Sequence, residues 1–555
     1  MWKIKHKIIF VILVLTGLIT NLNAQVMSYL SNEQVALFTD RTIYVINEEI
    51  LFSCNLIHNE KSTFGDFSNV LYVELVTPNG ESVISEKFKL INSYCSGKIT
   101  IPDNILTGYY YLKAYTKVMR NNGPNSYHYT RFKIINPYKN DLVSYNPSQT
   151  VSESIDAKDD SLLLISTDKR VYSNREKVSV SIKCESGEFK NKCISISVIP
   201  EFSFNAINIK ALPTIEISSD ELYNLENKGI SITGKIIDEE TGLKLPNIKI
   251  NLSIIGSNRD FMATVSDSLG NFVFVLPDLY GQNSIFISCQ KKPDINPKIM
   301  VLNDFCTSKN SMETPSFKLT EEERKLVYKI AVNKEIKSIF QDTSRINKPF
   351  KTYDNVFYGK PTRTLYPDSY IDLPTIEDCF IELPFNVRII KVKDEKYFKI
   401  TGGKSEFLIY EPLILVDMVA ITDYKKVLSI SPKKISHIDI ITAPYVKGNM
   451  IYGGIISIFS KNGDYGGINL PESGIFLNYN FFSENSNSIN GDYISINKPD
   501  IRNTLLWLPN LVLSNNNTSE FDFFTSDSDG RYVILVRAIK NNGETVTQSE
   551  HFEVQ

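Results

Sequence analysis

The feature that most constrains the fold of this chain is a period-2 alternation of apolar and polar residues. It occurs in runs of five to eight residues, and clusters of Asn, Gly, Pro and Ser interrupt it about every ten residues. Successive side chains of a strand point to opposite faces, so such a run makes one apolar face. Residues 69 to 90, NVLYVELVTPNGESVISEKFKL, show the pattern, with Pro78-Asn79-Gly80 as the turn. The alternation predicts a mainly β protein built from sandwich domains.

An internal repeat indicates that two of these sandwiches stand in tandem. The segment TDRTIYVINEEILFS, which begins at position 39, matches TDKRVYSNREKVSVS at position 167, an offset of 128 residues. We expect the two aspartates, Asp40 and Asp168, to cap a turn. We expect the two tyrosines, Tyr44 and Tyr172, to fill one end of each sandwich with the hydroxyl facing water.

The N-terminus has the pattern of a secretory signal peptide over residues 1–24. Lys3, Lys5 and Lys7 precede an apolar run from Ile8 to Ile19, and small residues stand before Gln25. A membrane anchor is the alternative, although the run is shorter than the ~20 residues that a span needs. We expect no transmembrane segment after cleavage. Loss of the three lysines makes the net charge of -3 more negative, which argues against nucleic acid as a partner.

The seven cysteines are too scattered over 555 residues to form a disulfide framework. Cys184 and Cys193 could bridge two neighbouring strands if their Cα atoms come within about 7 Å. Two buried free thiols are the other interpretation.

The first repeat carries a family resemblance. FTDRTIYVINEEILFSC, LYVELVTPNGE and GYYYLKAYTKVMRNNG (108 to 123) resemble the second macroglobulin domain of the α2-macroglobulin family, in the version attached to outer-membrane proteins of Bacteroidetes. The resemblance implies a macroglobulin-like β-sandwich over residues 25–138, a linker at 139–160 and a second such sandwich at 161–228. The family's thioester motif, of the Gly-Cys-Gly-Glu-Gln type, does not occur in this sequence, so the resemblance does not imply protease trapping.

A second module occupies residues 229–300. ISITGKIIDEETGLKLPNIKINLS and TVSDSLGNFVFVLPDL alternate strands with turns at Glu240-Thr241-Gly242 and at Asp267 to Gly270. The segment resembles the carboxypeptidase regulatory-like domain, a small seven-strand-like sandwich that carries no catalytic zinc. We expect it to act as a spacer or docking module.

Between residues 316 and 342 the period changes to that of a helix. Thr320 and Glu323 have the spacing of a capping box. The apolar stripe is partly continuous and comprises Leu326, Val327, Ile330, Ile336, Ile339 and Phe340. The helix either binds a partner or packs onto the protein's own sheets.

Residues 366–466 are similar to the plug domain of TonB-dependent receptors, an α+β fold. YIDLPTIEDCFIELPFNVRI, EPLILVDMVAITDYKKVLSISPKKISHIDIITAP and MIYGGIISIFSKNGD follow one another in the order of such plugs. Met418 stands where plugs usually have Gly, and no TonB box precedes the domain. Gly453 and Gly454 favour a β-bulge or a close strand crossing, and His437 is expected to be structural. Residues 467 to 555 are too few for a 22-strand barrel, so we expect no barrel.

The remaining segment, 467–555, predicts a C-terminal β-sandwich. Strands are expected at Thr504 to Leu508, Glu520 to Thr525 and Tyr532 to Ile539. Asp527-Ser528-Asp529-Gly530 is interpreted as a plain turn rather than a calcium loop, because the later ligands of such a loop are missing. The region is similar to the C-terminus of the same Bacteroidetes proteins.

No motif for catalysis, cofactor binding or metal binding stands out, and the sequence gives no candidate residue for any of the three. We therefore expect a protein that is not an enzyme and that needs no cofactor. It is expected in the periplasm or at the outer membrane, with the cell-surface face possible. The predicted function is an interaction scaffold that engages an outer-membrane β-barrel protein through its plug-like and sandwich domains. The alternatives are an accessory ligand-binding component of TonB-dependent nutrient uptake and a protease inhibitor without a thioester.

Overall fold

The computed structural model describes most of the chain, and its strands fall into two compact units. Unit 1 comprises residues 1–229, 305–347 and 482–555, and unit 2 comprises residues 230–304 and 348–481. The described residues are 33–58, 67–147, 163–184, 189–205, 222–256, 259–290, 295–307, 309–340, 356–370, 373–383, 386–392, 395–401, 409–448, 450–486, 488–495, 497–514 and 516–555. The predicted signal peptide and residues 148–160 of the predicted linker lie outside them.

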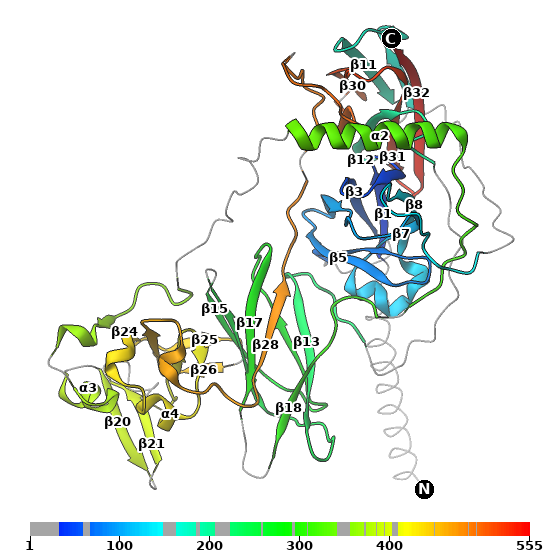
Figure 1. The fold of residues 1–555 in the computed structure, drawn as a ribbon. Helices are drawn as coiled ribbons and strands as arrows, with labels where there is room; N and C mark the ends of the chain where they lie inside the picture. Colours follow the sequence, from blue (N-terminus) through cyan, green and yellow to red (C-terminus); the bar gives the residue numbers. More distant parts are fainter. Residues whose placement is uncertain are drawn as a thin grey trace, which may run out of the picture. The chain divides into compact units, whose positions relative to one another are not determined.

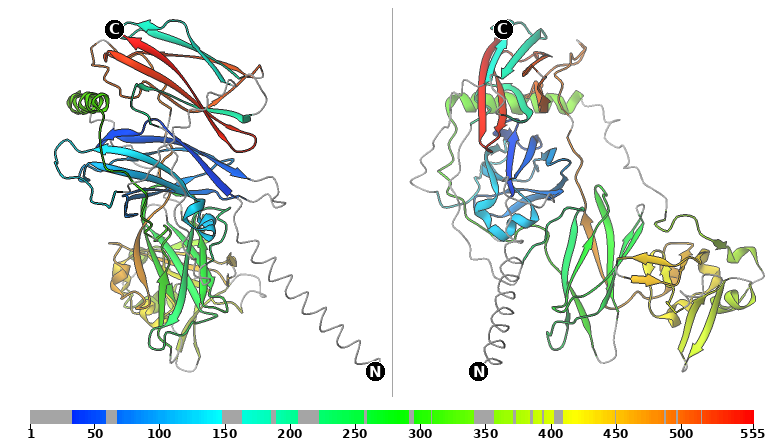
Figure 2. Two further views of the ribbon diagram at one scale, coloured as in Figure 1. Left: turned by 90° about the vertical axis from the view of Figure 1, so that its right-hand side faces the viewer. Right: turned by 180° about the vertical axis from the view of Figure 1, so that it is seen from behind.

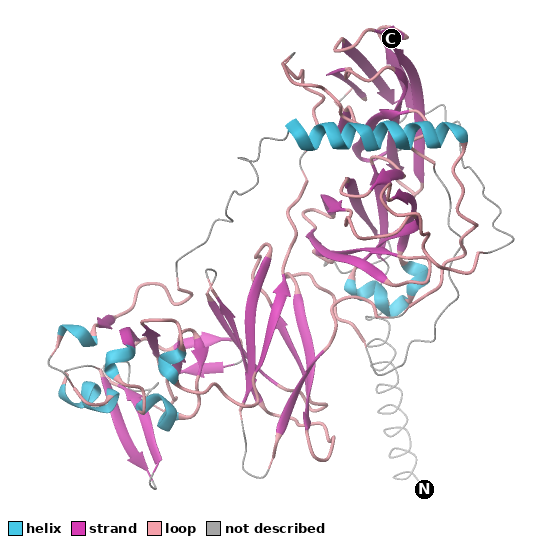
Figure 3. Cartoon of the chain, in the orientation of Figure 1, coloured by secondary structure: helices cyan, strands magenta, loops and turns pink. Residues whose placement is uncertain are grey.

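The fold is mainly β, as the alternation predicts, and helices are few (Figure 3). The first sandwich of unit 1 pairs a three-stranded sheet with a five-stranded sheet. The smaller sheet has the order β1 (Glu33–Thr39), β3 (Glu49–His58), β6 (Tyr94–Thr100). The larger has the order β2 (Ile43–Val45), β8 (His128–Ile135), β7 (Gly108–Tyr115), β4 (Val70–Val76), β5 (Ser82–Lys89). The predicted turn at Gly80 joins β4 to β5 with a φ of 78°.

The second sandwich of unit 1 also has one five-stranded and one three-stranded sheet. The larger has the order β10 (Val171–Tyr172), β32 (Thr545–Val554), β31 (Gly530–Lys540), β12 (Phe189–Pro200), β29 (Leu506–Val512). The smaller has the order β30 (Thr518–Phe524), β11 (Lys177–Cys184), β9 (Leu163–Thr167). Strands from two distant parts of the sequence, teal and red in Figure 1, therefore lie together in the same sheets.

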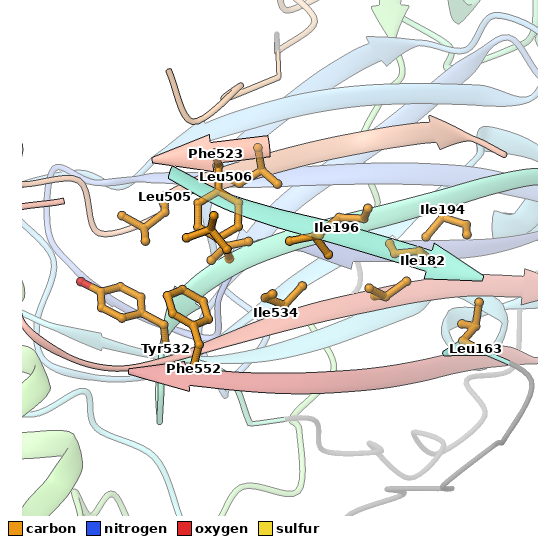
Figure 4. Packing of buried hydrophobic residues seen from close by; sticks show 14 of the residues in the cluster. Leu163, Ile182, Ile194, Ile196, Leu505, Leu506, Phe523, Tyr532, Ile534 and Phe552 are labelled. Atoms are coloured by element: carbon orange, nitrogen blue, oxygen red, sulfur yellow. The ribbon is translucent and has the colours of Figure 1, made fainter. Parts of the chain in front are cut away.

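This arrangement corrects the predicted division into separate sandwiches at 161–228 and 467–555. Figure 4 shows the reason, because Ile182, Ile194 and Ile196 from the earlier segment share one core with Phe523 and Ile534 from the later one. Neither segment has enough strands to close a core alone, so each buries its apolar face against the other. The predicted strands of the later segment occur within one to four residues of their expected ends.

Helix α2 (Glu321–Phe340) confirms the predicted helix and its capping box. Thr320 N–H donates to Glu323 Oε2 at 2.8 Å, and Glu323 N–H donates to Thr320 Oγ1 at 3.2 Å. The Lys133 ammonium of the first sandwich binds the Glu323 carboxylate at 2.7 Å. Asn333 donates to Asn503 of the second sandwich at 3.0 Å. The helix thus lies across the junction of the two sandwiches (Figure 2), and it packs onto its own unit through Leu326, Val327 and Ile330.

Unit 2 begins with a seven-stranded sandwich. One sheet has the order β16 (Asn271–Val275), β13 (Ser231–Asp238), β18 (Pro297–Val301). The other has the order β15 (Asp260–Val265), β14 (Lys249–Ile255), β17 (Gln282–Cys289), β28 (Ile475–Asn480). Six strands come from the segment predicted as a small sandwich. The seventh, β28, comes from the segment that the sequence assigned to the C-terminal sandwich, so that boundary also needs correction.

The rest of unit 2 is an α+β domain, as predicted for residues 366–466. Its sheet has the order β19 (Arg363–Leu365), β24 (Ile435–Ile441), β27 (Ile455–Ser460), β22 (Leu413–Val416), β23 (Val419–Ala420). Two hairpins and two short helices complete it: β20 (Val387–Val392) with β21 (Glu395–Ile400), β25 (Tyr445–Lys447) with β26 (Met450–Tyr452), α3 (Ile376–Glu382) and α4 (Tyr424–Leu428).

Short 3-10 turns occur in both units. Those of unit 1 are Lys117–Asn122 and Pro124–Ser126, and those of unit 2 are Pro367–Ser369, Pro432–Lys434 and Tyr465–Gly467.

The α+β domain and the unit 2 sandwich share buried residues. Phe261 and Ala263 of β15 pack with Leu413, Leu415 and Met418 of the α+β sheet. Phe286 of β17 belongs to the main core of the α+β domain. The two parts of unit 2 therefore form a single packed body rather than two separate domains joined by a linker.

Candidate interaction surfaces

The repeat predicted at an offset of 128 residues is present in the structure as two copies of one hydrogen-bonded motif at the sandwich end. Tyr44 Oη donates to Asp40 Oδ1 at 2.7 Å, and Tyr172 Oη donates to Asp168 Oδ1 at 2.8 Å. The same carboxylate oxygens also accept backbone N–H groups, from Leu51 at 3.1 Å and from Ser179 at 2.8 Å. The aspartates thus tie a turn to a strand as expected. The tyrosine hydroxyls bind the aspartates, which corrects the expectation that they face water.

The rest of the motif repeats as closely. The glutamates at matching positions, Glu48 and Glu176, accept the N–H groups of Val45 and Ser173 at 2.8 and 2.7 Å. Each glutamate also pairs with a basic side chain, Arg41 or Lys169. Asn47 and Arg175 both have a positive φ, 63° and 57°. In both copies the short strand that contains the tyrosine is parallel to its neighbour, β2 to β8 and β10 to β32.

Unit 2 carries an open groove of about 810 Å³ between its sandwich and its α+β domain. Lys249 and Asn251 of β14 line one side, and residues of the α+β domain line the other. Four tyrosines are among the lining residues: Tyr397, Tyr410, Tyr424 and Tyr452. A second groove of about 630 Å³ shares Ile421, Thr422 and Asp423 with the first. Because the walls belong to one packed body, we call the 810 Å³ space the unit 2 groove and treat it as preformed.

Hydrogen bonds hold two of the groove tyrosines in place. Tyr424 donates to Glu411 at 3.1 Å, and Tyr397 donates to Glu395 at 2.7 Å. Burial, and then the Glu411 carboxylate, raise the pKa of Tyr424. The hydrogen bond to Glu395 raises the pKa of Tyr397. Both phenols therefore stay neutral donors at physiological pH, and their rings offer flat surfaces with a polar tip.

The segment from 443 to 467 forms the edge of this groove and the centre of the α+β sheet. Met450, Ile451 and Tyr452 line the groove, while β27 is paired on both sides. Gly454 has a φ of 127°, and an added Cβ would meet Ile441 O at 2.4 Å. This confirms the backbone role expected of the glycine pair at Gly454. Asp417 and Met418, with φ of 46° and 72°, form the two-residue turn between β22 and β23, a turn that favours Gly at its second position.

The side chains considered as metal ligands, those of His437, Asp527 and Asp529, make contacts that stabilise the fold. The His437 ring stacks on Phe459 with centroids 4.4 Å apart. Asp527 accepts a hydrogen bond from Arg175 Nη2 at 2.7 Å, and Asp529 pairs with Lys329. Within the described ranges, no group of three or more His, Cys, Asp or Glu side chains could hold a metal ion. Cys184 is buried, as the interpretation of two buried thiols expects. The Cys193 side chain lies outside the described residues, so the choice between that interpretation and a bridge stays a prediction.

Sequence reasoning did not find the unit 2 groove. Its lining residues come from segments that are far apart in the sequence, and the family resemblances of those segments do not indicate that they face a common groove. Ile409, whose side chain is 80% exposed at the groove, was not singled out from the sequence, because an isoleucine next to a tyrosine also fits a buried strand.

Neither a protein-family model nor a curated protein matches this chain. Among solved structures, the chain is similar to a mutant α2-macroglobulin of Salmonella, with 9% identity and a TM-score of 0.24, over 95% of this chain and 40% of that one. It is also similar to the native conformation of Escherichia coli α2-macroglobulin, with 8% identity and a TM-score of 0.24, over 94% and 40%. The adhesin InvE of Yersinia pseudotuberculosis matches at 12% identity and a TM-score of 0.12, over 52% and 64%. The chain spans about two fifths of the length of the two α2-macroglobulins.

Over the part of the chain that the structure describes, none of the helices has the length and apolar character needed to cross a membrane.

Proposed function

We propose that this protein is a non-enzymatic interaction scaffold of the bacterial periplasm or outer membrane, and that unit 2 binds a partner protein in its groove. The observation that supports the proposal best is the groove itself, which two domains with a shared core hold open. A preformed surface loses less conformational entropy on binding than a surface that must first become ordered.

The composition of the groove suits a polypeptide ligand. Its four tyrosines bring large, stiff contact surfaces with a hydrogen-bonding tip, as is typical of the energetic centres of protein interfaces. Lysine and acidic side chains line it together, among them Lys249, Lys425, Glu395 and Glu411. Because side chains of both charges line the groove, a partner with a matching pattern of charges binds in one register and is distinguished from other partners.

The partner that we propose is an outer-membrane β-barrel protein, which would present a loop or an extended segment to the groove. This step rests on the resemblance of residues 366–466 to receptor plug domains, whose natural setting is the inside of such a barrel. The TonB-linked transport itself would then belong to the partner chain.

A pulldown from detergent-solubilised outer membranes tests the proposal. The tagged full-length protein should enrich a β-barrel protein, and Ile409→Asp should remove that enrichment because it places a charge in the groove. Ile381→Asp is the matched control, since Ile381 is also exposed but lies on α3 outside the groove. Recovery of the protein alone from the soluble periplasm would overturn the proposal, as would full enrichment by the Ile409 variant.

A second candidate is an accessory ligand-binding protein for nutrient uptake. The volume of the unit 2 groove, about 810 Å³, lies within the roughly 300–1,000 Å³ range of small-molecule sites. A screen of thermal unfolding against sugars, peptides and metal chelates distinguishes this ligand-binding function from the interaction scaffold. A ligand that stabilises the wild type but not Ile409→Asp supports uptake, and a flat screen counts against it.

A further inference from the structure

The two copies of the sandwich-end motif have the same internal geometry but opposite exposure. Ile43 of the first copy is 1% exposed, whereas Val171 at the matching position is 49% exposed. Ala36 is 4% exposed, whereas its counterpart Leu164 is 47% exposed. Part of the surface that is buried in the first sandwich is therefore open to solvent in the second. We call its exposed residues the second motif surface; they are Leu164, Ser166, Asp168 to Val171, Ser173, Asn174 and Lys177.

The cover of the first copy can be described residue by residue. The Ser203 carbonyl accepts the N–H groups of Thr42 and Ile43 at 2.9 and 3.2 Å. Thr504 Oγ1 donates to Asp40 Oδ2 at 2.7 Å, and Asn503 Nδ2 donates to Glu48 Oε1 at 2.9 Å. Asn205 N–H also donates to Thr42 Oγ1 at 2.7 Å. The cover thus offers one carbonyl acceptor and neutral donors from its loops.

The apolar part of the cover comes from the outer face of the larger sheet of the second sandwich. Ile539 of β31 packs with Ala36, Phe38 and Ile57 of the first sandwich. The Arg537 guanidinium lies 5.4 Å from the centroid of the Phe38 ring. A sheet face of one sandwich, flanked by two loops, therefore covers the motif end of another.

We propose that the second motif surface is a docking site for a β-sandwich domain of a different protein, which covers it as the second sandwich covers the first. The turn that such a cover would contact already has the same conformation as in the first copy. Asp168, Tyr172 and Glu176 make the same hydrogen bonds as Asp40, Tyr44 and Glu48. The site lies in unit 1 and goes beyond the groove proposed in unit 2.

The residues that differ between the copies describe the partner. Arg170 and Lys177 replace Thr42 and Glu49 at matching positions, and Lys169 replaces Arg41. Lys169 and Lys177 pair with Glu176 and Asp522, whereas no ion pair forms at the exposed Arg170 within the described residues. We expect a partner sheet face with apolar residues opposite Leu164 and Val171, and a loop with an acidic side chain opposite Arg170.

A second copy of this chain does not provide such a face in the same way. The outer face of its own larger sheet is already covered by its own first sandwich, through Ile539 and Arg537. A partner with its own uncovered sandwich face therefore fits the surface better than self-association.

Photo-crosslinking of the full-length protein tests the inference. A benzophenone amino acid replaces Val171, and in a matched control it replaces Leu243, an exposed residue of a unit 2 turn. Irradiation in cells should give an adduct from position 171 and not from position 243. Mass spectrometry of the crosslinked peptide should place the partner residue on a strand of a β-sandwich.

Two further changes decide whether the adduct reports the proposed surface. Leu164→Lys and Arg170→Glu should each lower the adduct yield about tenfold, because each opposes the expected apolar or acidic contact. Both side chains are exposed, and an unchanged unfolding midpoint checks that folding is intact. An adduct that survives both changes overturns the proposal. So does an adduct within this chain, between two copies of it, or with a protein that has no β-sandwich, and so does the absence of any adduct.

Discussion

The hydroxyl of Tyr44 donates a 2.7 Å hydrogen bond to Asp40, and both side chains are buried. Burial, and then the Asp40 charge, raise the pKa of Tyr44 well above its usual value, so the phenol remains a donor. The pair joins β2, which contains Tyr44, to the turn after β1, which contains Asp40.

Replacement of Tyr44 by Phe should destabilise unit 1 by about 1–3 kcal/mol, because a buried carboxylate oxygen loses one of its donors. Tyr172→Phe should cost less, since water can reach Asp168. Hydrogen exchange of the β1 and β3 amides measures the first effect, and exchange of the β9 and β11 amides measures the second. An equal or larger effect at Tyr172 would contradict the explanation.

Gly454→Ala should destabilise unit 2 by about 2–4 kcal/mol, because the new Cβ collides with a carbonyl and the residue is forced to a positive φ. Gly463 is the matched control in the same domain. It also has a positive φ, 66°, but an added Cβ would meet nothing within 4 Å. Gly463→Ala should therefore cost only about 1–2 kcal/mol. Denaturant unfolding of both variants measures the difference, which should vanish if steric contact at Ile441 is unimportant.

Thr320→Ala should lower the stability of α2 by about 1 kcal/mol, because the Glu323 N–H loses its cap. The readout is hydrogen exchange of the first turn of α2, which should become about fivefold faster. Ser338→Ala, near the other end of the helix, serves as control, since Ser338 Oγ only donates to Glu335 O. If the first-turn amides of α2 exchange at the same rate in both variants, tertiary contacts rather than the cap determine where the helix begins.

The stability of unit 1 should fall as pH falls from about 6.5 toward 4. Burial lowers the pKa of His128 to about 4, below the ordinary value of about 6.5 in an unfolded chain. The unfolded state therefore binds the proton first, so the stabilisation is complete above pH 6.5 and is lost as the pH approaches 4. Denaturant midpoints between pH 7 and pH 5 should fall less steeply in His128→Gln. An unchanged slope would rule out this histidine as the cause.

Arg537→Met should leave unit 1 as stable as the wild type or stabilise it by about 1–4 kcal/mol. Burial lowers the pKa of Arg537 to about 10, so the fold disfavours its charge at every pH below that value. Its guanidinium contacts Ser197 Oγ at 3.3 Å and three aromatic rings, those of Phe38, Phe204 and Trp507. Methionine keeps the volume without the charge. Arg537→Ala should instead cost about 2–5 kcal/mol through the cavity, and equal losses in both variants would show that the charge itself is needed.

Local features of the fold could be predicted from the sequence because they depend on neighbours in the chain. The capping box of Thr320 and Glu323, the turn at Gly80 and the two copies of the motif all involve short spacings, and the structure confirms them. Strands β29, β30 and β31 of the last segment were also predicted from alternation alone, whereas β28 and β32 were not.

The pairing of strands could not be predicted in the same way. Alternation shows which face of a strand is apolar, but not which strand lies beside it. Ile196 could therefore not be matched to Leu508, its partner in the register of β12 and β29. The groove was missed for the same reason, because Ile409 and Lys249 line one groove only after the domains of unit 2 have packed.

The bond between Asp40 and Thr504 joins residues that are 464 positions apart. At about 5–20 residues per second, a ribosome needs roughly half a minute to a minute and a half to make that stretch. During this time the first sandwich has no cover over Asp40, Arg41 and Glu48. During the same time Ala36, Phe38 and Ile57 lack their contact with Ile539 of β31, so the nascent first sandwich exposes an apolar patch beside charged groups that water can hydrate.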